Sequence, residues 1–154
     1  MENMNRKDYW NKDYLEYWKS VTSDAEIEDG NKSNIMKISG SDYKSSGIRV
    51  ATAFFDMMTY EKSEKLLDLG CGFGRFFSYF SNKCQYYGVD ISKEMIEECK
   101  KLFCDFKDSF FVSEGEDLPF EDGFFDKIIC YGVFDACYQD RALQEILRVC
   151  KKGG

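Results

Sequence analysis

Short apolar runs and helically spaced apolar residues alternate along the second half of the chain. The uninterrupted apolar stretches predict four strands, at Leu66–Leu69, Tyr86–Asp90, Phe110–Ser113 and Asp126–Tyr131. Helical spacing follows the first, second and fourth of them, at Phe76–Phe80, Ser92–Phe103 and Arg141–Lys151. Strands that alternate with helices predict a parallel sheet in a doubly wound α/β fold, where ligands bind at the carboxyl ends of the strands.

Individual residues predict the start of one of these helices and the buried face of another. Ser92 is a predicted N-cap, and Glu94 follows it near the positive end of the helix. In the last helix the apolar spacing predicts an inward face made of Leu143, Ile146, Leu147 and Cys150.

The first 60 residues follow a different pattern. Tyr14, Tyr17 and Trp18 share one face of a predicted helix, whereas residues 22–46 are polar and predict a loop or a lid. Residues 47–60 carry a helical apolar stripe. We therefore expect an N-terminal helical cap or lid over 1–46 and a ligand-binding domain over 47–154.

Composition and charge narrow the class of protein. Hydrophobic residues make up 44% of the 154, which indicates a globular domain, and no apolar run approaches the roughly 20 residues of a membrane helix. The net charge of -7 argues against a nucleic-acid partner. Seven cysteines without paired spacing, no histidine and no signal peptide predict a cytoplasmic protein with reduced thiols and no metal site.

The stretch "KLLDLGCGFGR" (65–75) predicts a buried strand that runs into a nucleotide-binding glycine loop. Its glycines give G-x-G-x-G, while a dinucleotide fingerprint is G-x-G-x-x-G, and Arg75 stands where that last glycine belongs. Asp90, at the end of the second predicted strand, suits a ribose in either case. Asp68 before the loop instead favours a ligand with a positive group, such as an amino-acid ammonium.

Four blocks together resemble the class I S-adenosylmethionine-dependent methyltransferases. They are "LLDLGCGFGR" (66–75), "YYGVDIS" (86–92), "SEGEDLPFEDGFFDKIICYGV" (113–133) and "LQEILRVCKKGG" (143–154). They span a little over half the chain, in the order and spacing of that family. The resemblance implies a Rossmann-like sheet with strand order 3-2-1-4 and S-adenosyl-L-methionine as cofactor, with S-adenosyl-L-homocysteine as product.

The resemblance also implies roles for individual residues. Asp68 and Gly70 would face the methionyl part, and Cys71, Gly72 and Gly74 would let the backbone approach the cofactor. Asp90 would accept the ribose hydroxyls, and Ile91 would pack on adenine. Glu114 and Gly115 occupy the adenine-edge positions, where the family usually has Asp or Asn and then Ala, so Glu116 is a further candidate. Around the methyl group we expect the aromatic rings of Tyr9, Trp10 and Tyr131.

Methyl transfer to a hydroxyl needs a base, and the chain has no histidine. Asp135 and Asp140 are the candidate bases, with Tyr138 as a hydrogen-bonding partner. Short length and acidic charge favour a small-molecule acceptor, and the residue usage suggests a bacterial source. Cys71 has no neighbour that would activate it, so we expect it to be structural.

The family's sheet has seven strands, and this chain stops before the fifth. The expected domain is thus C-terminally incomplete, and its fourth strand would be an edge open to a partner chain or a second copy. A truncated active enzyme is the first hypothesis. The alternatives are an inactive cofactor-binding fragment or partner subunit, and an NAD-binding oxidoreductase.

Overall fold

The computed structural model describes residues 53 and 55–154. The chain divides into two compact units, Met1–Tyr60 and Glu61–Gly154, and the account below concerns the second. Tyr9, Trp10, the expected lid over 1–46 and the expected domain boundary after residue 46 lie outside the described residues.

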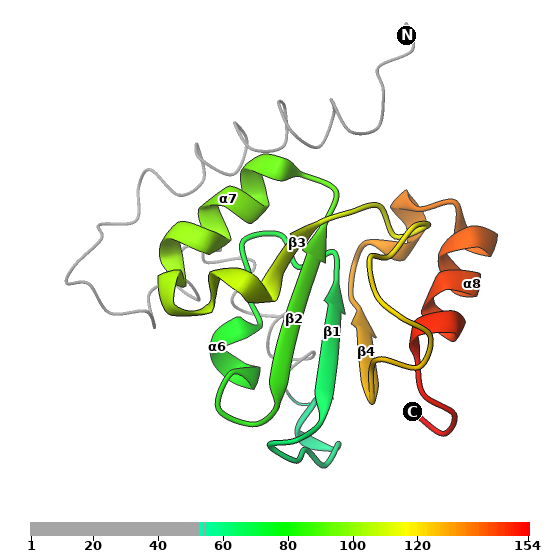
Figure 1. Ribbon diagram of the computed structural model, residues 1–154, viewed down its shortest axis with the longest axis horizontal. Helices are drawn as coiled ribbons and strands as arrows, with labels where there is room; N and C mark the ends of the chain where they lie inside the picture. Colours follow the sequence, from blue (N-terminus) through cyan, green and yellow to red (C-terminus); the bar gives the residue numbers. More distant parts are fainter. Residues whose placement is uncertain (1–52, 54) are drawn as a thin grey trace, which may run out of the picture. The chain divides into compact units, whose positions relative to one another are not determined.

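The strands of the described chain form one parallel sheet in the order β3-β2-β1-β4 (Figure 1). The strands are β1 (Lys65–Leu69), β2 (Gln85–Asp90), β3 (Phe110–Val112) and β4 (Lys127–Cys130). β1 pairs with β2 on one side and with β4 on the other, and β3 pairs only with β2. The predicted strand order and parallel direction are therefore confirmed.

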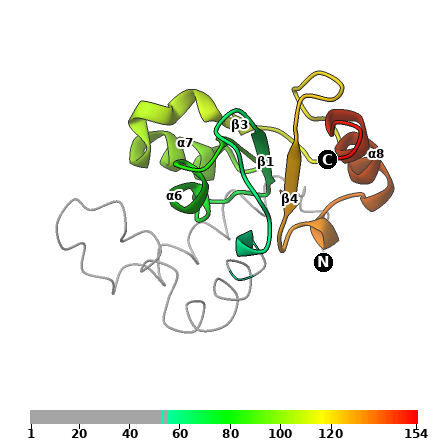
Figure 2. The same ribbon diagram turned by 90° about the horizontal axis from the view of Figure 1, so that it is seen from below.

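Helices cover both faces of this sheet (Figures 1 and 2). They are α6 (Phe77–Phe80), α7 (Lys93–Leu102) and α8 (Gln139–Val149), with 3₁₀ turns at Cys104–Ser109 and Phe134–Ala136. α6 and α7 lie on one face, and α8 lies on the other. No helix within the described residues is long and apolar enough to cross a membrane.

Side-chain alternation along the strands divides the core in two. On the α8 face, Leu67, Leu69 and Val89 pack with Val149 of α8. On the opposite face, Tyr86 of β2 meets Phe77 of α6 at a ring-centroid distance of 5.3 Å. Because a residue and its chain neighbour point to opposite faces of a strand, Asp68 lies on the face of α6 and α7.

The predicted start of α7 is confirmed. Ser92 has an extended backbone, and its hydroxyl accepts the Met95 N–H at 3.3 Å. The buried residues of the helix are Met95 and Ile96 and, one turn later, Cys99, which together form one face. This cap places the helix directly after Asp90, so the end of β2 is held by the helix that follows it.

The connection from β3 to β4, residues 113–126, contains no helix in the described structure. Aromatic side chains cover the sheet there in place of a crossover helix. Phe125 is fully buried, and its ring lies 5.5 Å from that of Tyr87 and 4.7 Å from that of Phe120. An irregular segment still has to satisfy its backbone groups, and residues of α8 do this.

That requirement corrects the predicted face of α8. Leu143 and Leu147 are 48% and 67% exposed, so the prediction that they point inward was wrong. Ile146 does pack against the core, as predicted, and the fully buried residues of α8 are Ala142 and Val149. Arg148 turns toward the β3–β4 connection and donates to the carbonyl of Phe120 at 2.7 Å, which rotates the leucines out to solvent.

The turn after β1 depends on glycine at two positions for different reasons. Gly70 has φ +78°, and a methyl group there would lie 2.6 Å from the Val133 side chain, which belongs to the chain after β4. Gly72 has φ +54°, yet no described atom lies within 4 Å of the corresponding position. Backbone conformation alone requires glycine at 72, whereas both conformation and packing require it at 70.

This difference yields a matched pair of variants. Gly72→Ala should lower the free energy of unfolding by about 1–2 kcal/mol, the cost of a left-handed non-glycine residue. Gly70→Ala should cost a further ~1–3 kcal/mol, because the added methyl group also collides with Val133. Urea unfolding of both variants measures the difference, and equal losses would contradict the packing argument.

A second pair tests the aromatic cover of the β3–β4 connection. Phe125→Ala should lower the free energy of unfolding by about 3–5 kcal/mol, because it empties a fully buried site. The matched control is Phe106→Ala, at a ring that is 44% exposed, which should cost only about 1 kcal/mol. Thermal unfolding of the two variants provides the comparison; a Phe125→Ala protein as stable as the control would refute the assigned role.

Candidate functional site

The carboxyl ends of the parallel strands bring four separate segments to one edge of the sheet. β1 leads into the glycine turn at 70–74, and β2 ends at Asp90. β3 leads into 113–117, and β4 leads into 131–133 (Figure 1). Most of the site residues predicted from the sequence thus lie at this edge, because all strands run in the same direction.

Asp90 ties the glycine turn to the end of β2. Its Oδ2 accepts the Gly72 N–H at 2.9 Å, and its Oδ1 accepts the Ser92 N–H at 2.9 Å. Burial raises the pKa of Asp90, while the backbone N–H groups of Ser92, Gly72 and Ile91 act in the opposite direction. Each carboxylate oxygen has a second lone pair, so Asp90 has the capacity to accept further hydrogen bonds.

Asp68 is a buried carboxylate with a tyrosine partner. It is 1% exposed, and its Oδ2 accepts the Tyr86 hydroxyl at 2.6 Å. Burial raises the pKa of Asp68 to about 6, although the Tyr86 hydrogen bond and the positive charge of Arg75 lower it. At neutral pH the side chain therefore carries a desolvated negative charge below the glycine turn.

Arg75 joins the glycine turn to the end of β4. Its Nη2 donates to the Tyr131 carbonyl at 3.2 Å, and its guanidinium lies 5.0 Å from the centre of the Tyr131 ring. The Tyr131 ring also meets Phe76 edge-on at 5.7 Å. Tyr131 is consequently held at the carboxyl end of β4 by a cation and a second ring.

The third glycine of the turn faces the core. A methyl group on Gly74 would lie 3.0 Å from the Phe103 ring and 3.3 Å from the Phe110 ring. Gly74 thus permits close packing of the turn against α7 and β3. Of the three glycines, Gly72 is the one at which an added methyl group would meet no atom of the described residues.

The segment after β3 forms a compact turn. Asp117 N–H bonds to the Glu114 carbonyl at 3.2 Å, and the Glu116 carboxylate accepts the Tyr138 N–H at 2.5 Å. Gly115 is buried, and a methyl group there would lie 3.2 Å from the Cys137 sulfur. Glu116 thus anchors the start of α8, and Cys137 fills the space that a side chain at 115 would need.

The predicted acid–base residues lie after β4, at the same edge of the sheet. Asp135 is in the 3₁₀ turn, Tyr138 precedes α8, and Asp140 is in its first turn. All three are exposed, Tyr138 to 68%. They are therefore accessible to a molecule from solvent.

Cys71 lies buried beneath the glycine turn. Burial raises the pKa of its thiol well above the usual range, so the sulfur stays protonated at neutral pH. The cysteines of the described chain are free thiols. The described residues contain no group of three side chains that could hold a metal ion.

Sequence reasoning missed four residues that organise this site, namely Arg75, Tyr86, Glu145 and Arg148. Arg75 was interpreted only as a departure from the dinucleotide fingerprint. Tyr86 has no sequence signal, because its partner is 18 residues away in the chain. The E-x-x-R spacing of Glu145 and Arg148 on one helix face was the signal available for a paired cluster.

The sequence profile of the family described as "Methyltransferase domain" matches residues 67–154. An uncharacterised Methanocaldococcus jannaschii protein is 32% identical over 113 residues, which cover 73% of this chain and 43% of that protein. The ubiquinone/menaquinone biosynthesis C-methyltransferase of Haemophilus ducreyi is 32% identical over 108 residues, 64% of this chain and 42% of that enzyme. The chain thus spans about two fifths of these relatives' lengths.

Solved structures agree with this fold. The YcgJ protein of Bacillus subtilis has a TM-score of 0.60 at 29% identity, covering 68% of this chain and 47% of its own. A SAM-dependent methyltransferase from Aquifex aeolicus has a TM-score of 0.59 at 22% identity, covering 80% and 69%. With its matched family profile and its parallel sheet, the chain belongs to the methyltransferase-domain family of class I S-adenosylmethionine-dependent methyltransferases.

Proposed function

We propose that this chain binds S-adenosylmethionine at the carboxyl edge of its sheet and takes part in methyl transfer to a small-molecule acceptor. The observation that carries the proposal is the pairing of Asp90 with Gly72. The carboxylate is held by two backbone N–H groups beside a glycine that has no described atom within 4 Å of the position a side chain would take. A ribose has two adjacent hydroxyl donors, which suit the remaining lone pairs of one carboxylate.

The neighbouring residues fit the other parts of this cofactor. The negative charge of Asp68, with Gly70 and Cys71 above it, suits the methionyl ammonium. Ile91 follows Asp90 and would pack on adenine, and Glu114 and Gly115 would meet its edge. Gly74 contributes by close packing of the turn, and Glu116 by its contact with the start of α8.

Bound S-adenosylmethionine would supply an activated methyl group, and the chain's part is to align and desolvate the reactants. Tyr131 presents an aromatic face at the end of β4, a position suited to a sulfonium. Asp135 and Asp140 are the proposed bases for an acceptor hydroxyl, and Tyr138 a hydrogen-bonding partner. Tyr9 and Trp10 remain proposed as aromatic cover over the methyl group.

A small-molecule acceptor is supported by the acidic charge of the chain and by one relative. The Haemophilus ducreyi relative is a ubiquinone/menaquinone biosynthesis C-methyltransferase. The net charge of -7 disfavours nucleic acid as acceptor. The proposed location is the cytoplasm, where S-adenosylmethionine and reduced cysteines coexist.

The proposed ribose contact is tested at Asp90. Asp90→Ala should weaken S-adenosylhomocysteine binding by about 1.5–3 kcal/mol, the scale of hydrogen bonds to a charged group. Isothermal titration calorimetry on the 154-residue chain measures the change. The matched control is Asp108→Ala, an exposed carboxylate just before β3 at the other end of the sheet, which should leave affinity unchanged.

Wild-type titrations test the proposal itself. S-adenosylmethionine and S-adenosylhomocysteine should both bind, and NAD should not. Binding of NAD alone would instead favour an oxidoreductase, and an unaltered Asp90→Ala affinity would remove Asp90 from the site. Product formation with candidate quinone or sugar acceptors then distinguishes an enzyme from a binding-only subunit.

The buried carboxylate of Asp68 should make ligand binding depend on pH. The raised pKa of Asp68, about 6, means that the carboxylate is mostly neutral at pH 5 and mostly charged at pH 7. Affinity for the ammonium-bearing ligand should therefore rise roughly tenfold from pH 5 to pH 7. Asp68→Asn should remove most of this rise. A wild-type affinity independent of pH would disprove the charge role.

Stability provides an independent check on the same carboxylate. An acid whose pKa is higher in the folded state than in the unfolded one stabilises the fold at low pH, and that stabilisation is lost as pH rises through about 6. Asp68→Asn should consequently raise the free energy of unfolding at pH 7 by about 1–3 kcal/mol and change it little at pH 4. Urea unfolding at the two pH values separates this effect from binding.

A further inference from the structure

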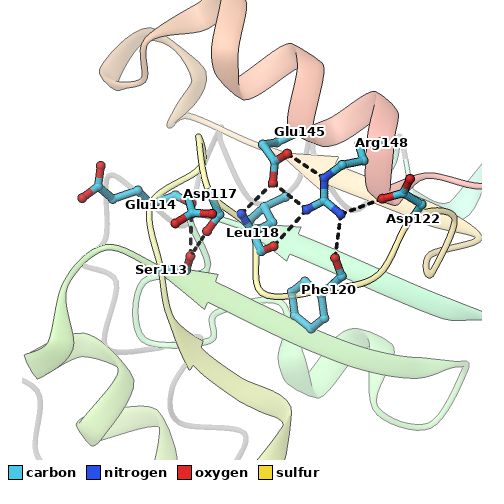
Figure 3. Close-up of polar contacts among 8 residues, drawn as sticks. All are labelled: Ser113, Glu114, Asp117, Leu118, Phe120, Asp122, Glu145 and Arg148. Carbon is cyan, nitrogen blue, oxygen red and sulfur yellow. Dashed lines mark hydrogen bonds and ion pairs between the residues drawn. The ribbon is translucent and has the colours of Figure 1, made fainter.

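A pair of charged side chains on α8 holds the irregular β3–β4 connection in place (Figure 3). Arg148 meets Glu145 through two contacts of 2.7 Å, from Nε and from Nη2. Arg148 also donates to the connection, at the carbonyls of Phe120 (2.7 Å) and Leu118 (3.0 Å) and at the carboxylate of Asp122 (3.0 Å). Glu145 Oε2 in turn accepts the Leu118 N–H at 2.8 Å.

This pair satisfies backbone groups on both sides of one peptide turn. Glu145 accepts the N–H of Leu118, and Arg148 donates to the carbonyls of Leu118 and Phe120. A different side chain with the same charge would therefore not make all of these hydrogen bonds. The Arg148 side chain is 32% exposed and that of Glu145 only 18%. The guanidinium holds the pKa of Glu145 below its usual range, as expected for a bidentate pair.

The position of Leu118 fixes the position of the segment before it. Its side chain is 3% exposed in the core with Leu69, and its backbone is bound by α8. Ser113 Oγ donates to the carbonyl of Asp117, the residue before Leu118, and this bond closes the turn that contains Glu114 and Gly115 (Figure 3). The position of the whole turn, 113–117, therefore follows from where α8 places Leu118.

The start of α8 holds the same turn from the other side. Glu116 accepts the Tyr138 N–H, and Gly115 packs against Cys137. The turn is thus fixed to α8 at two points, one before the helix and one in its last half. A turn held at two points presents its remaining donors and acceptors in one orientation.

We propose that Glu145 and Arg148 are positioning residues for recognition of the adenine edge. The pair sets where the Gly115 N–H and the Glu114 side chain lie, without touching the base itself. The inference rests on the proposed function, because it assumes that S-adenosyl ligands bind with the base beside 114–115. Adenine presents an acceptor at N1 and a donor at its 6-amino group, which complement an N–H and a carboxylate.

The test compares two ligands that differ only at this edge. S-inosylhomocysteine carries a 6-oxo group and an N1–H, so its donors and acceptors are reversed relative to S-adenosylhomocysteine. The measured quantity is the ratio of the two dissociation constants, obtained by calorimetry on the full chain. Wild type should prefer the adenosyl ligand, and Arg148→Lys should lower this preference about tenfold, because lysine cannot bridge Glu145 and two carbonyls at once.

Two control variants separate positioning from loss of stability. Phe80→Leu disturbs a fully buried ring on the α6 face of the sheet, so it destabilises the domain without touching α8 or the turn. Its ligand preference should equal that of wild type. Asp122→Asn removes the ion pair of Arg148 to a side chain that is 83% exposed, and should also leave the preference unchanged. Glu145→Gln, which keeps an acceptor for Leu118, replaces Arg148→Lys if that variant does not fold.

The outcomes are distinct. An unchanged preference in Arg148→Lys, or an equal loss in Phe80→Leu, overturns the positioning role. A wild type that binds both ligands equally also overturns it, since the turn then does not discriminate the base. A wild type that binds neither ligand refutes the proposed function itself.

Discussion

The structure depends on the backbone hydrogen bonds of a connection that has no helix of its own. In a doubly wound fold a crossover helix both covers the sheet and satisfies its own peptide groups. Residues 113–126 do the first with the rings of Phe120, Phe124 and Phe125. Their peptide groups at Leu118 and Phe120 are instead satisfied by hydrogen bonds to the side chains of Glu145 and Arg148 of α8. These hydrogen bonds account for the orientation of α8, the exposure of its leucines and the position of the turn after β3.

The candidate site is built in the same way, from contacts between segments far apart in the chain. Asp90 binds the N–H of Gly72, and Arg75 binds the carbonyl of Tyr131, so the ends of β1, β2 and β4 are tied to one another. Val133 packs on Gly70 at a distance that excludes any side chain there. These ties leave the site preorganised, and they place a desolvated carboxylate, Asp68, under the turn, where the charge of Arg75 offsets only part of the effect of burial.

Coupling between the two halves of the site is a consequence of α8. Its start carries the contact of Glu116 with Tyr138 and lies next to Asp135 and Asp140, the proposed bases. Its last half carries the pair that positions Leu118. One rigid element thus connects the segment proposed to read the base with the segment proposed to meet the acceptor.

The sequence by itself determined the strands and the N-cap of α7, because apolar runs and caps are local signals. The order of the strands came from the resemblance of four sequence blocks to the methyltransferase family, and not from any local pattern. It also indicated which residues end each strand, and a parallel sheet must bring those together. On α8 it correctly predicted that Ile146 faces the core, but it could not determine that Leu143 and Leu147 are exposed, since they carry a stronger apolar signal than Ala142 and Val149. Only the tertiary structure decided that, because the unsatisfied backbone at Leu118 and Phe120 requires Glu145 and Arg148 to face inward. The pairing of Asp68 with Tyr86 was likewise decided only by the packing of β1 beside β2, a contact that no local pattern encodes.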